Sequence, residues 1–457
     1  MKKNCYVSGQ WFRQISSSQV KIPSMKSLMR RVVALLIVFL IVSPTPSPAY
    51  SVLTHEAVID VLWDTNLRPL LLKRFPDSTP DDLLKAHAYA YGGAIVQDMG
   101  YYPGGSKFFS DLTHYFRSGD FIIALLHNAS SLNEYAFALG ALSHYAADND
   151  GHPLATNLSV PQLYPSLRRK YGHVVTYEDN PLAHIRTEFG FDVLQVAKGR
   201  YASDSYRNFV GFEVSLPLLD KAFLDTYGIE LKSITKNEEH AANTYRYCVS
   251  TLIPRASRVA WNLKQDDIQK DLPGITRKKF LYNISRSSYE KEWGKDYSRP
   301  TAGDKFLAFV IRIMPKIGPL RVFTFRTPTP EAEKLFERSF NATVDRYRQL
   351  LVAVGNGQLE LPNDNFDVGK VTLRGEYKLN DKTCAELLDR LARERMASID
   401  PELKTQLLAY YVEKDPAAAP RKHDKSAMKI QQEIKTLQET PSSAVVSGES
   451  SMAEPLQ

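Results

Sequence analysis

Helical periodicity is the feature that most constrains the fold of this 457-residue chain. Between Leu132 and Asp148, apolar side chains recur three or four residues apart, at Tyr135, Leu139, Leu142 and Tyr145. This spacing places them on one face of an α-helix. No sustained run of alternating apolar and polar residues, which would be typical of strands, accompanies it. The sequence therefore predicts an all-α protein.

Further helices are expected on both sides of residue 264. The predicted helices cover residues 216–226, 238–263, 329–354, 382–395 and 401–412. Thr329 is a suitable cap for the longest of them, and Glu331 and Glu333 follow in its first turn, where the helix dipole favours acids. Residues 366–377 alternate and fit a short hairpin. The apolar residues 306–319 fit a buried helix or a surface that meets lipid, and the buried helix is favoured.

The first 49 residues have the pattern of a secretory leader. Arg30 and Arg31 precede an unbroken apolar run, Val32 to Val42, and small residues follow as far as Ala49. These are the three parts of a signal peptide, so we expect export and cleavage after Ala49. An uncleaved membrane anchor is the alternative, although the apolar run is short for a membrane span.

Net charge gives no support for a nucleic-acid partner. The whole chain carries a formal charge of +7, and residues 1–49 contain seven basic residues and no acid. Residues 50–457 are therefore neutral overall, and bulk charge would not hold a polyanion. Cys248 and Cys384 are the only cysteines after the leader, and a disulfide and two buried thiols both remain open. Any metal must then be held by histidine and carboxylate.

Histidine is concentrated in one part of the chain. Eight of the ten histidines lie between His55 and His184. Within this region, His144 precedes Asp148 by four residues and His184 precedes Glu188 by four. Residues four apart on a helix project from the same face, so each pair can reach one metal ion, as the two histidines of HExxH do. One pair alone is more often a surface ion pair, but two pairs together favour a metal site.

The segment from Phe137 to Pro153, FALGALSHYAADNDGHP, resembles the signature of the bacterial zinc-dependent phospholipases C. The fungal single-strand-specific zinc nucleases are their relatives. The resemblance implies an all-α, multi-helix core that holds up to three zinc ions in a cleft. It also implies a ligand set in a fixed chain order, beginning with the free α-amine of the cleaved chain. The matching candidates here are Tyr50, His55, Asp98, His114, His144, Asp148, His152, His184 and Glu188.

The resemblance also implies roles for these residues. Asp98, His114, His144 and Asp148 would hold one zinc ion, and Asp148 would bridge to a second ion bound by His55 and the Tyr50 terminus. The third ion would be held by His152, His184 and Glu188. Asp98 is the expected catalytic residue, because a carboxylate can ligate through one oxygen and take a proton from the attacking water with the other. The remaining histidines, His87, His127 and His173, are expected to be structural. Manganese or iron would also suit such ligands.

The leading functional hypothesis is an exported zinc-dependent phosphodiesterase, similar to phospholipase C, that acts on phospholipids at a membrane surface. The first alternative is an extracellular single-strand nuclease on the same metal core, with nucleic acid as its partner. The second is a zinc-binding module without catalytic activity. The neutral chain after the leader favours lipid over a polyanion. The full set of nine candidate ligands argues against the silent module, because a binding module has no need to keep all nine.

These expectations divide the chain into four parts. Residues 1–49 are the leader, and residues 50–264 form the domain that resembles phospholipase C. Residues 265–414 form a mostly helical C-terminal extension. Residues 415–457 contain few large apolar side chains and are expected to be a disordered tail.

Overall fold

The structure is a computed structural model that describes residues 51–202, 207, 209–253, 256, 324–394, 399–411 and 425–442. All of these belong to the second of two units of the chain, Ser43–Gln457. The expected leader and the apolar stretch 306–319 lie outside the described residues, so their predictions stay untested.

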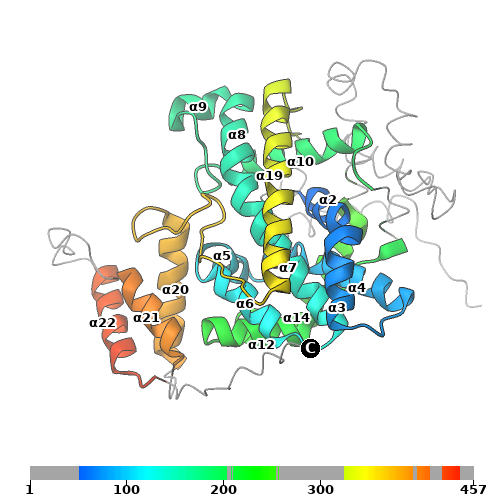
Figure 1. Cartoon of the computed structure of the whole chain (residues 1–457). Helices are drawn as coiled ribbons and strands as arrows, with labels where there is room; N and C mark the ends of the chain where they lie inside the picture. The colour runs from blue at the N-terminus through cyan, green and yellow to red at the C-terminus, as the bar shows by residue number, and fades with distance from the viewer. Residues whose placement is uncertain are drawn as a thin grey trace, which may run out of the picture. The chain divides into compact units, whose positions relative to one another are not determined.

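The described residues are mostly helical and contain no strand, only two isolated bridges. The all-α prediction is therefore confirmed. The N-terminal helices (Figure 1) are α2 Val52–Leu62, α3 Arg68–Arg74, α4 Pro80–Gly93, α5 Lys107–Tyr115, α6 Ser118–Asn128, α7 Leu132–Gly151, α8 Asn157–Leu163, α9 Pro165–Tyr171 and α10 Pro181–Ala197. Those that follow are α12 Leu216–Tyr227, α13 Leu231–Ile234, α14 Glu238–Tyr247, α19 Pro330–Gly355, α20 Lys378–Glu394, α21 Pro401–Tyr411 and α22 Lys425–Glu439.

Local sequence explains where the main helices begin. Ser131 caps α7 by accepting a hydrogen bond from the backbone N–H of Glu134, whose carboxylate accepts one in return from the Ser131 N–H. This reciprocal capping box satisfies amides that would otherwise lack a partner. Thr329 caps α19 through the N–H of Ala332, as the sequence predicts. Both helices begin within one residue of their predicted starts.

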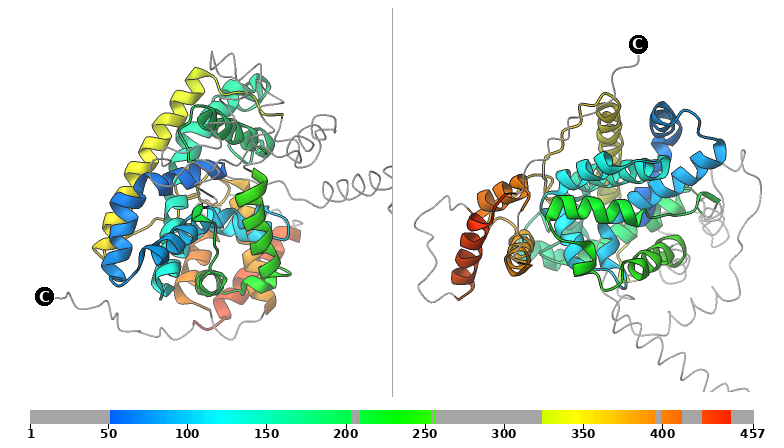
Figure 2. Two further views of the ribbon diagram at one scale, coloured as in Figure 1. Left: turned by 90° about the vertical axis from the view of Figure 1, so that its right-hand side faces the viewer. Right: turned by 90° about the horizontal axis from the view of Figure 1, so that it is seen from below.

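Helix α7 lies in the core and carries almost no exposed surface after its first turn. It packs against α2, α4, α6 and α19, and the long α19 also contacts α2 and α8 (Figure 1 and Figure 2). The crossing of α4 and α7 is especially close. A Cβ atom on Gly93 would lie 1.9 Å from the carbonyl oxygen of Phe137, and one on Gly140 would lie 2.2 Å from that of Ala90. Only glycine allows the two backbones to approach this closely.

Two of the helix junctions are turns of π-helix. Trp63–Leu67 joins α2 to α3, and His152–Thr156 joins α7 to α8. In the second turn, Pro153 has no N–H to continue the α-helical ladder, and the Asn157 N–H bonds instead to the His152 carbonyl. Such wide turns often mark functional positions in helices.

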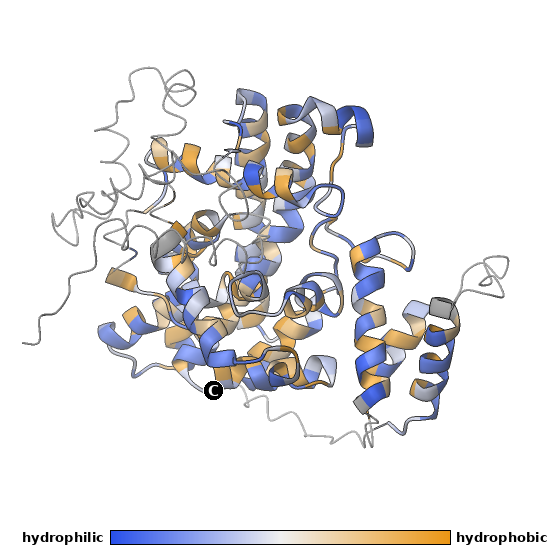
Figure 3. Ribbon diagram, turned by 180° about the vertical axis from the view of Figure 1, so that it is seen from behind, coloured by the Kyte–Doolittle hydropathy of each residue, from blue (hydrophilic) through white to orange (hydrophobic). Residues whose placement is uncertain are grey.

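Two expectations about the C-terminal part are wrong. Residues 366–377 contain turns and the single bridge between Asn365 and Lys370 rather than a hairpin. The stretch expected to be a disordered tail contains α22, which contacts α20 and α21. Figure 3 shows hydrophilic and hydrophobic stretches alternating along α20 and α22. Leu387, Leu391 and Leu437 are buried there, so α22 helps to bury an apolar face.

Two further findings concern the cysteines and the possibility of a membrane-spanning helix. Cys248 and Cys384 are both buried and free, so the disulfide that the sequence left open does not form. Among the described helices, none is both long enough and apolar enough to cross a membrane.

The α4–α7 crossing leads to a stability prediction. Gly140→Ala places a methyl group against the Ala90 carbonyl, and relieving that overlap must move one helix. We expect the free energy of unfolding to fall by about 1–3 kcal/mol, measured by urea denaturation. Gly355→Ala is the control, because its new Cβ would meet only the flexible Leu70 side chain, at 3.3 Å. Equal losses in both variants would contradict the prediction.

Candidate metal centre

The predicted pair on α7 forms the middle of a buried cluster. Nε2 of His144 lies 3.1 Å from Oδ2 of Asp148, and neither side chain is exposed. Nδ1 of His144 is 3.0 Å from the carbonyl oxygen of Ala94, which can only accept. The proton therefore sits on Nδ1, and the lone pair of Nε2 faces Asp148.

Three further elements bring ligands to the same carboxylate. From α5, His114 donates its Nδ1–H to the Ser110 carbonyl at 2.7 Å, so Nε2 faces Asp98 at 3.4 Å and Asp148 at 3.5 Å. From α2, Nε2 of His55 lies 3.5 Å from the other oxygen of Asp148. Asp98 comes from a 3-10 turn, Val96–Tyr101. We call these residues the Asp148 cluster: His55, Asp98, His114, His144 and Asp148.

A second group adjoins the first. Nδ1 of His184 lies 2.8 Å from Oε1 of Glu188 on α10, the predicted spacing of four residues, and both are buried. The imidazole of His152 stacks on that of His184 with 4.9 Å between ring centroids. We call His152, His184 and Glu188 the Glu188 cluster. Nε2 of His152 is 3.8 Å from Oδ2 of Asp148, which links the two clusters.

The donor atoms of these clusters fit metal ions. Both carboxylate oxygens of Asp98 and of Asp148 are buried without a hydrogen bond, and buried charges of this kind cost several kcal/mol unless a cation compensates them. Three overlapping triads have all their donor atoms within 4.8 Å of one another. The triads are His55, His144 and Asp148; Asp98, His114 and His144; and His152, His184 and Glu188. Imidazole nitrogen and carboxylate oxygen are ordinary zinc ligands.

Comparison with known proteins agrees with this geometry. Residues 54–237 match the family model for zinc dependent phospholipase C. This segment belongs to the zinc-dependent phospholipase C family. The chain matches no curated protein and no solved structure. The phospholipase C segment contains every member of both clusters.

Eight of the nine candidate ligands are thus brought together, and the ninth, Tyr50, lies outside the described residues. The three histidines expected to be structural do not join the clusters. His87 is buried and stacks on Trp63 with 3.8 Å between ring centroids, while His127 and His173 are exposed.

Three polar residues near the clusters were not predicted. Asp192 follows Glu188 by four residues on α10, and its carboxylate accepts hydrogen bonds from the Leu53 N–H at 2.9 Å and the Thr54 hydroxyl at 2.6 Å. The repeated spacing of four along α10 was a usable signal for it. Asn157 and Asp367 contact the Glu188 cluster. No sequence pattern pointed to them, and Asp367 lies far outside the family segment.

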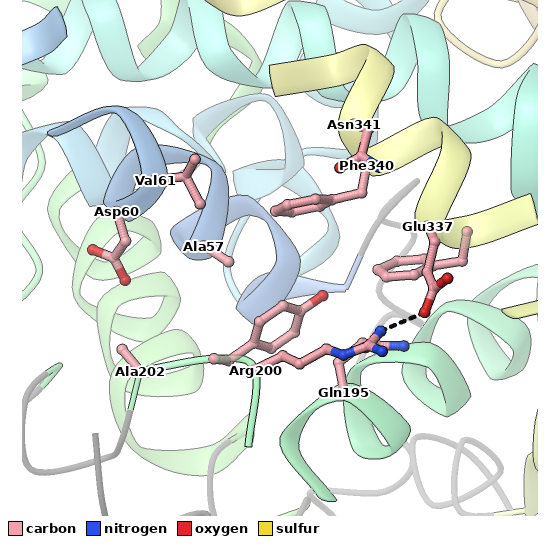
Figure 4. A pocket seen from close by; sticks show the side chains of 11 residues that line it. Ala57, Asp60, Val61, Gln195, Arg200, Ala202, Glu337, Phe340 and Asn341 are labelled. Atoms are coloured by element: carbon pink, nitrogen blue, oxygen red, sulfur yellow. Dashed lines mark hydrogen bonds and ion pairs between the residues drawn. The ribbon is translucent and has the colours of Figure 1, made fainter. Parts of the chain in front are cut away.

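A cavity of about 450 Å³ lies near α2 but belongs to a different place (Figure 4). Its lining comes from α2, α19 and the end of α10, with the Arg200–Glu337 ion pair at 2.6 Å on its wall. None of the eight ligand residues lines it. This cavity is therefore separate from the metal centre of the phospholipase C segment.

Burial and neighbouring charge set the protonation of the clusters. Burial lowers the pKa of His55 and of His184 to about 3, so both imidazoles are neutral at pH 7 and can ligate. Burial also opposes the charged form of His114, but Asp148 and Asp98 outweigh it and raise the pKa to about 10. Burial raises the pKa of Glu188 well above its usual range. Without metal, the site therefore holds protons on groups that must lose them to ligate.

This gives a prediction about metal loading. At pH 7, His114 with a pKa of about 10 is protonated in the metal-free protein, and zinc binding must displace that proton. The apparent affinity for zinc should therefore rise with pH up to about 10. We expect at least one proton to be released per chain, measured by calorimetric titration in two buffers of different ionisation enthalpy. A binding enthalpy that does not depend on the buffer would contradict this.

Proposed function

We propose that the protein is an exported, zinc-dependent phospholipase C-like enzyme that hydrolyses phosphodiester bonds of phospholipids. One observation carries the proposal. The buried Asp148 carboxylate faces four imidazoles at 3.1–3.8 Å while its oxygens accept no hydrogen bond. These residues would suit more than one metal ion, and two adjacent ions would supply the charge stabilisation used in phosphodiester hydrolysis.

The residues of the Asp148 cluster have distinct tasks in this proposal. Zinc, when bound, would activate water and offset the negative charge of the phosphate. The hydrogen bonds from His114 and His144 to the Ser110 and Ala94 carbonyls hold their Nε2 atoms toward the carboxylates. Asp98 is the proposed catalytic base. It is buried, and neither of its oxygens accepts a hydrogen bond, so one oxygen is available to take a proton from water.

Phospholipid is the proposed substrate, and a membrane surface is the proposed partner. Support comes from the family segment and from the neutral charge of residues 50–457, which gives no general attraction to a polyanion. A single-strand nuclease on the same clusters remains the second candidate. A silent zinc module is a weaker candidate, because binding alone does not require two adjoining clusters with a buried carboxylate between them.

Substitution of Asp148 tests this proposal. Asp148→Asn keeps the shape but removes the charge that the imidazoles share, so we expect loss of bound zinc and a fall in hydrolysis of about 10³-fold or more. The assays are elemental analysis and hydrolysis of phosphatidylcholine vesicles and of single-stranded DNA by leader-free protein. Asp98→Asn should lower turnover by about 10²–10⁴-fold.

Asp150→Asn is the matched control on α7, since Asp150 faces Arg346 at 3.6 Å and belongs to neither cluster. It should keep zinc and activity. Cleavage of DNA without cleavage of phospholipid would show that the nuclease is the correct alternative. Zinc without hydrolysis of either substrate would favour the silent module, and absence of zinc would remove the proposal altogether.

Export and cleavage after Ala49 are part of the proposal, because cleavage there would free the α-amine of Tyr50 as a ligand. The anchoring of Leu53 and Thr54 to Asp192 on α10, the helix of Glu188, supports it. N-terminal sequencing of the exported protein should read Tyr-Ser-Val-Leu. A form that retains Ala49 in front of Tyr50 should bind one zinc ion less tightly, measured by competition with a chelator. Equal zinc affinity in both forms would exclude the amine as a ligand.

A further inference from the structure

We propose that Asp367, a residue of the C-terminal extension, is a positioning residue for the Glu188 cluster. It would hold His152 through its carboxylate and His184 through Asn157, so that both imidazoles present their other nitrogen to metal. This inference rests on the proposed zinc function. Because the family segment ends at residue 237, it also means that the metal centre is completed by a part of the chain outside that segment.

One carboxylate oxygen of Asp367 accepts hydrogen bonds, and the other does not. Oδ2 accepts a hydrogen bond from the Tyr177 N–H at 2.9 Å and another from the Tyr377 hydroxyl at 2.6 Å. Oδ1 is buried, has no hydrogen-bond partner, and lies 3.0 Å from Nδ1 of His152. The two donors on Oδ2 therefore hold Oδ1 against the imidazole edge.

The contact is on the edge of His152 that faces away from the Asp148 cluster. Nε2 of the same ring points toward Asp148 at 3.8 Å, so Nδ1 contacts Asp367 while Nε2 is directed to the metal ligands. In this structure Nδ1 of His152 also lacks a hydrogen bond, and a small rotation of the ring would form one to Oδ1. A carboxylate behind a ligating histidine fixes its tautomer and raises its basicity.

Asn157 links Asp367 to His184 through two hydrogen bonds. Its Nδ2 donates to the Asp367 carbonyl oxygen at 2.6 Å, so its Oδ1 must face the other way and accept from Nε2–H of His184 at 2.7 Å. The neutral imidazole has only one N–H, which leaves the lone pair of Nδ1 directed at Glu188, 2.8 Å away. The backbone of Asp367 therefore sets the tautomer of His184, and its side chain acts on His152.

The segment that carries Asp367 is docked onto the ligand helices. The Phe366 N–H donates to the His114 carbonyl at 3.0 Å, and its ring lies 5.4 Å from the His114 ring, centroid to centroid. Gly369 has a φ of +67°, and a Cβ there would lie 2.7 Å from the carbonyl oxygen of Asn149 on α7. These contacts hold the backbone of Asp367 in a fixed position, as a positioning residue requires.

The test is the zinc affinity of leader-free full-length Asp367→Asn. The wild type should hold two or three zinc ions. In the variant, the ion held by the Glu188 cluster should lose about 10–100-fold in affinity, measured by elemental analysis after titration with a chelator, and the affinity for the other ions should be unchanged. The variant keeps the backbone carbonyl that Asn157 uses, so only His152 loses its partner.

Two variants complete the design. Asp364→Asn is the control, because Asp364 lies on the same segment and, among the described residues, its side chain accepts a hydrogen bond from the Tyr145 hydroxyl alone, at 3.3 Å. Zinc affinity should not change in this variant. Tyr377→Phe removes one hydrogen-bond donor to Asp367 and should produce a smaller loss of affinity for the same ion. This variant tests the proposal if Asp367→Asn does not fold. Thermal unfolding of the metal-free proteins checks for a general loss of stability.

The outcomes separate the inference from the function on which it rests. Folded Asp367→Asn that binds every ion as tightly as the wild type would overturn the positioning role and leave the enzyme proposal intact. Equal weakening of all ions together with lower thermal stability would show a structural role instead, and would also overturn it. A wild type without zinc would overturn the proposed function itself.

Discussion

The buried carboxylate of Asp148 is the constraint on which the rest of the structure depends. Imidazoles from α2, α5, α7 and the turn after α7 converge on its two oxygens. A fully buried anion is tolerated only where cationic or metal partners surround it. The helices must therefore meet at one point, and the glycine contacts at Gly93 and Gly140 that let α4 approach α7 help to make that possible.

Much of the fold and site could be predicted because the relevant signals are local. His144 with Asp148, and His184 with Glu188, are four residues apart on helices whose apolar period is visible in the sequence. The family resemblance supplied the order of the remaining ligands. Asp367 could not be predicted, because its contacts with His152 depend on tertiary folding across more than 200 residues. No spacing rule extends over such a distance.

The two errors in the C-terminal part also have physical reasons. Residues 366–377 alternate in polarity, but Phe366 bonds through its backbone to His114, so tertiary docking outweighs strand pairing. Residues 425–439 are polar overall, and their few apolar side chains suffice for a helix because α20 and α21 offer a surface that covers them. A helix of this kind depends on packing more than on its own composition.

Two buried acids outside the clusters connect the ligand residues to distant parts of the fold. Asp192 ties the residues just before His55 to α10, and Asp367 lies behind His152 on a segment that follows α19. Burial raises the pKa of Asp192 to about 6. Burial opposes the ionised form of Asp367 too, but His152, His184 and Tyr377 outweigh it and lower the pKa of that carboxyl. A cation bound between the clusters would stabilise the folded state only, since the unfolded chain does not bring these groups together. Under the proposed role of Asp367, zinc binding would also stabilise the C-terminal extension, and removal of that extension would weaken the metal centre even if every family ligand remained in place.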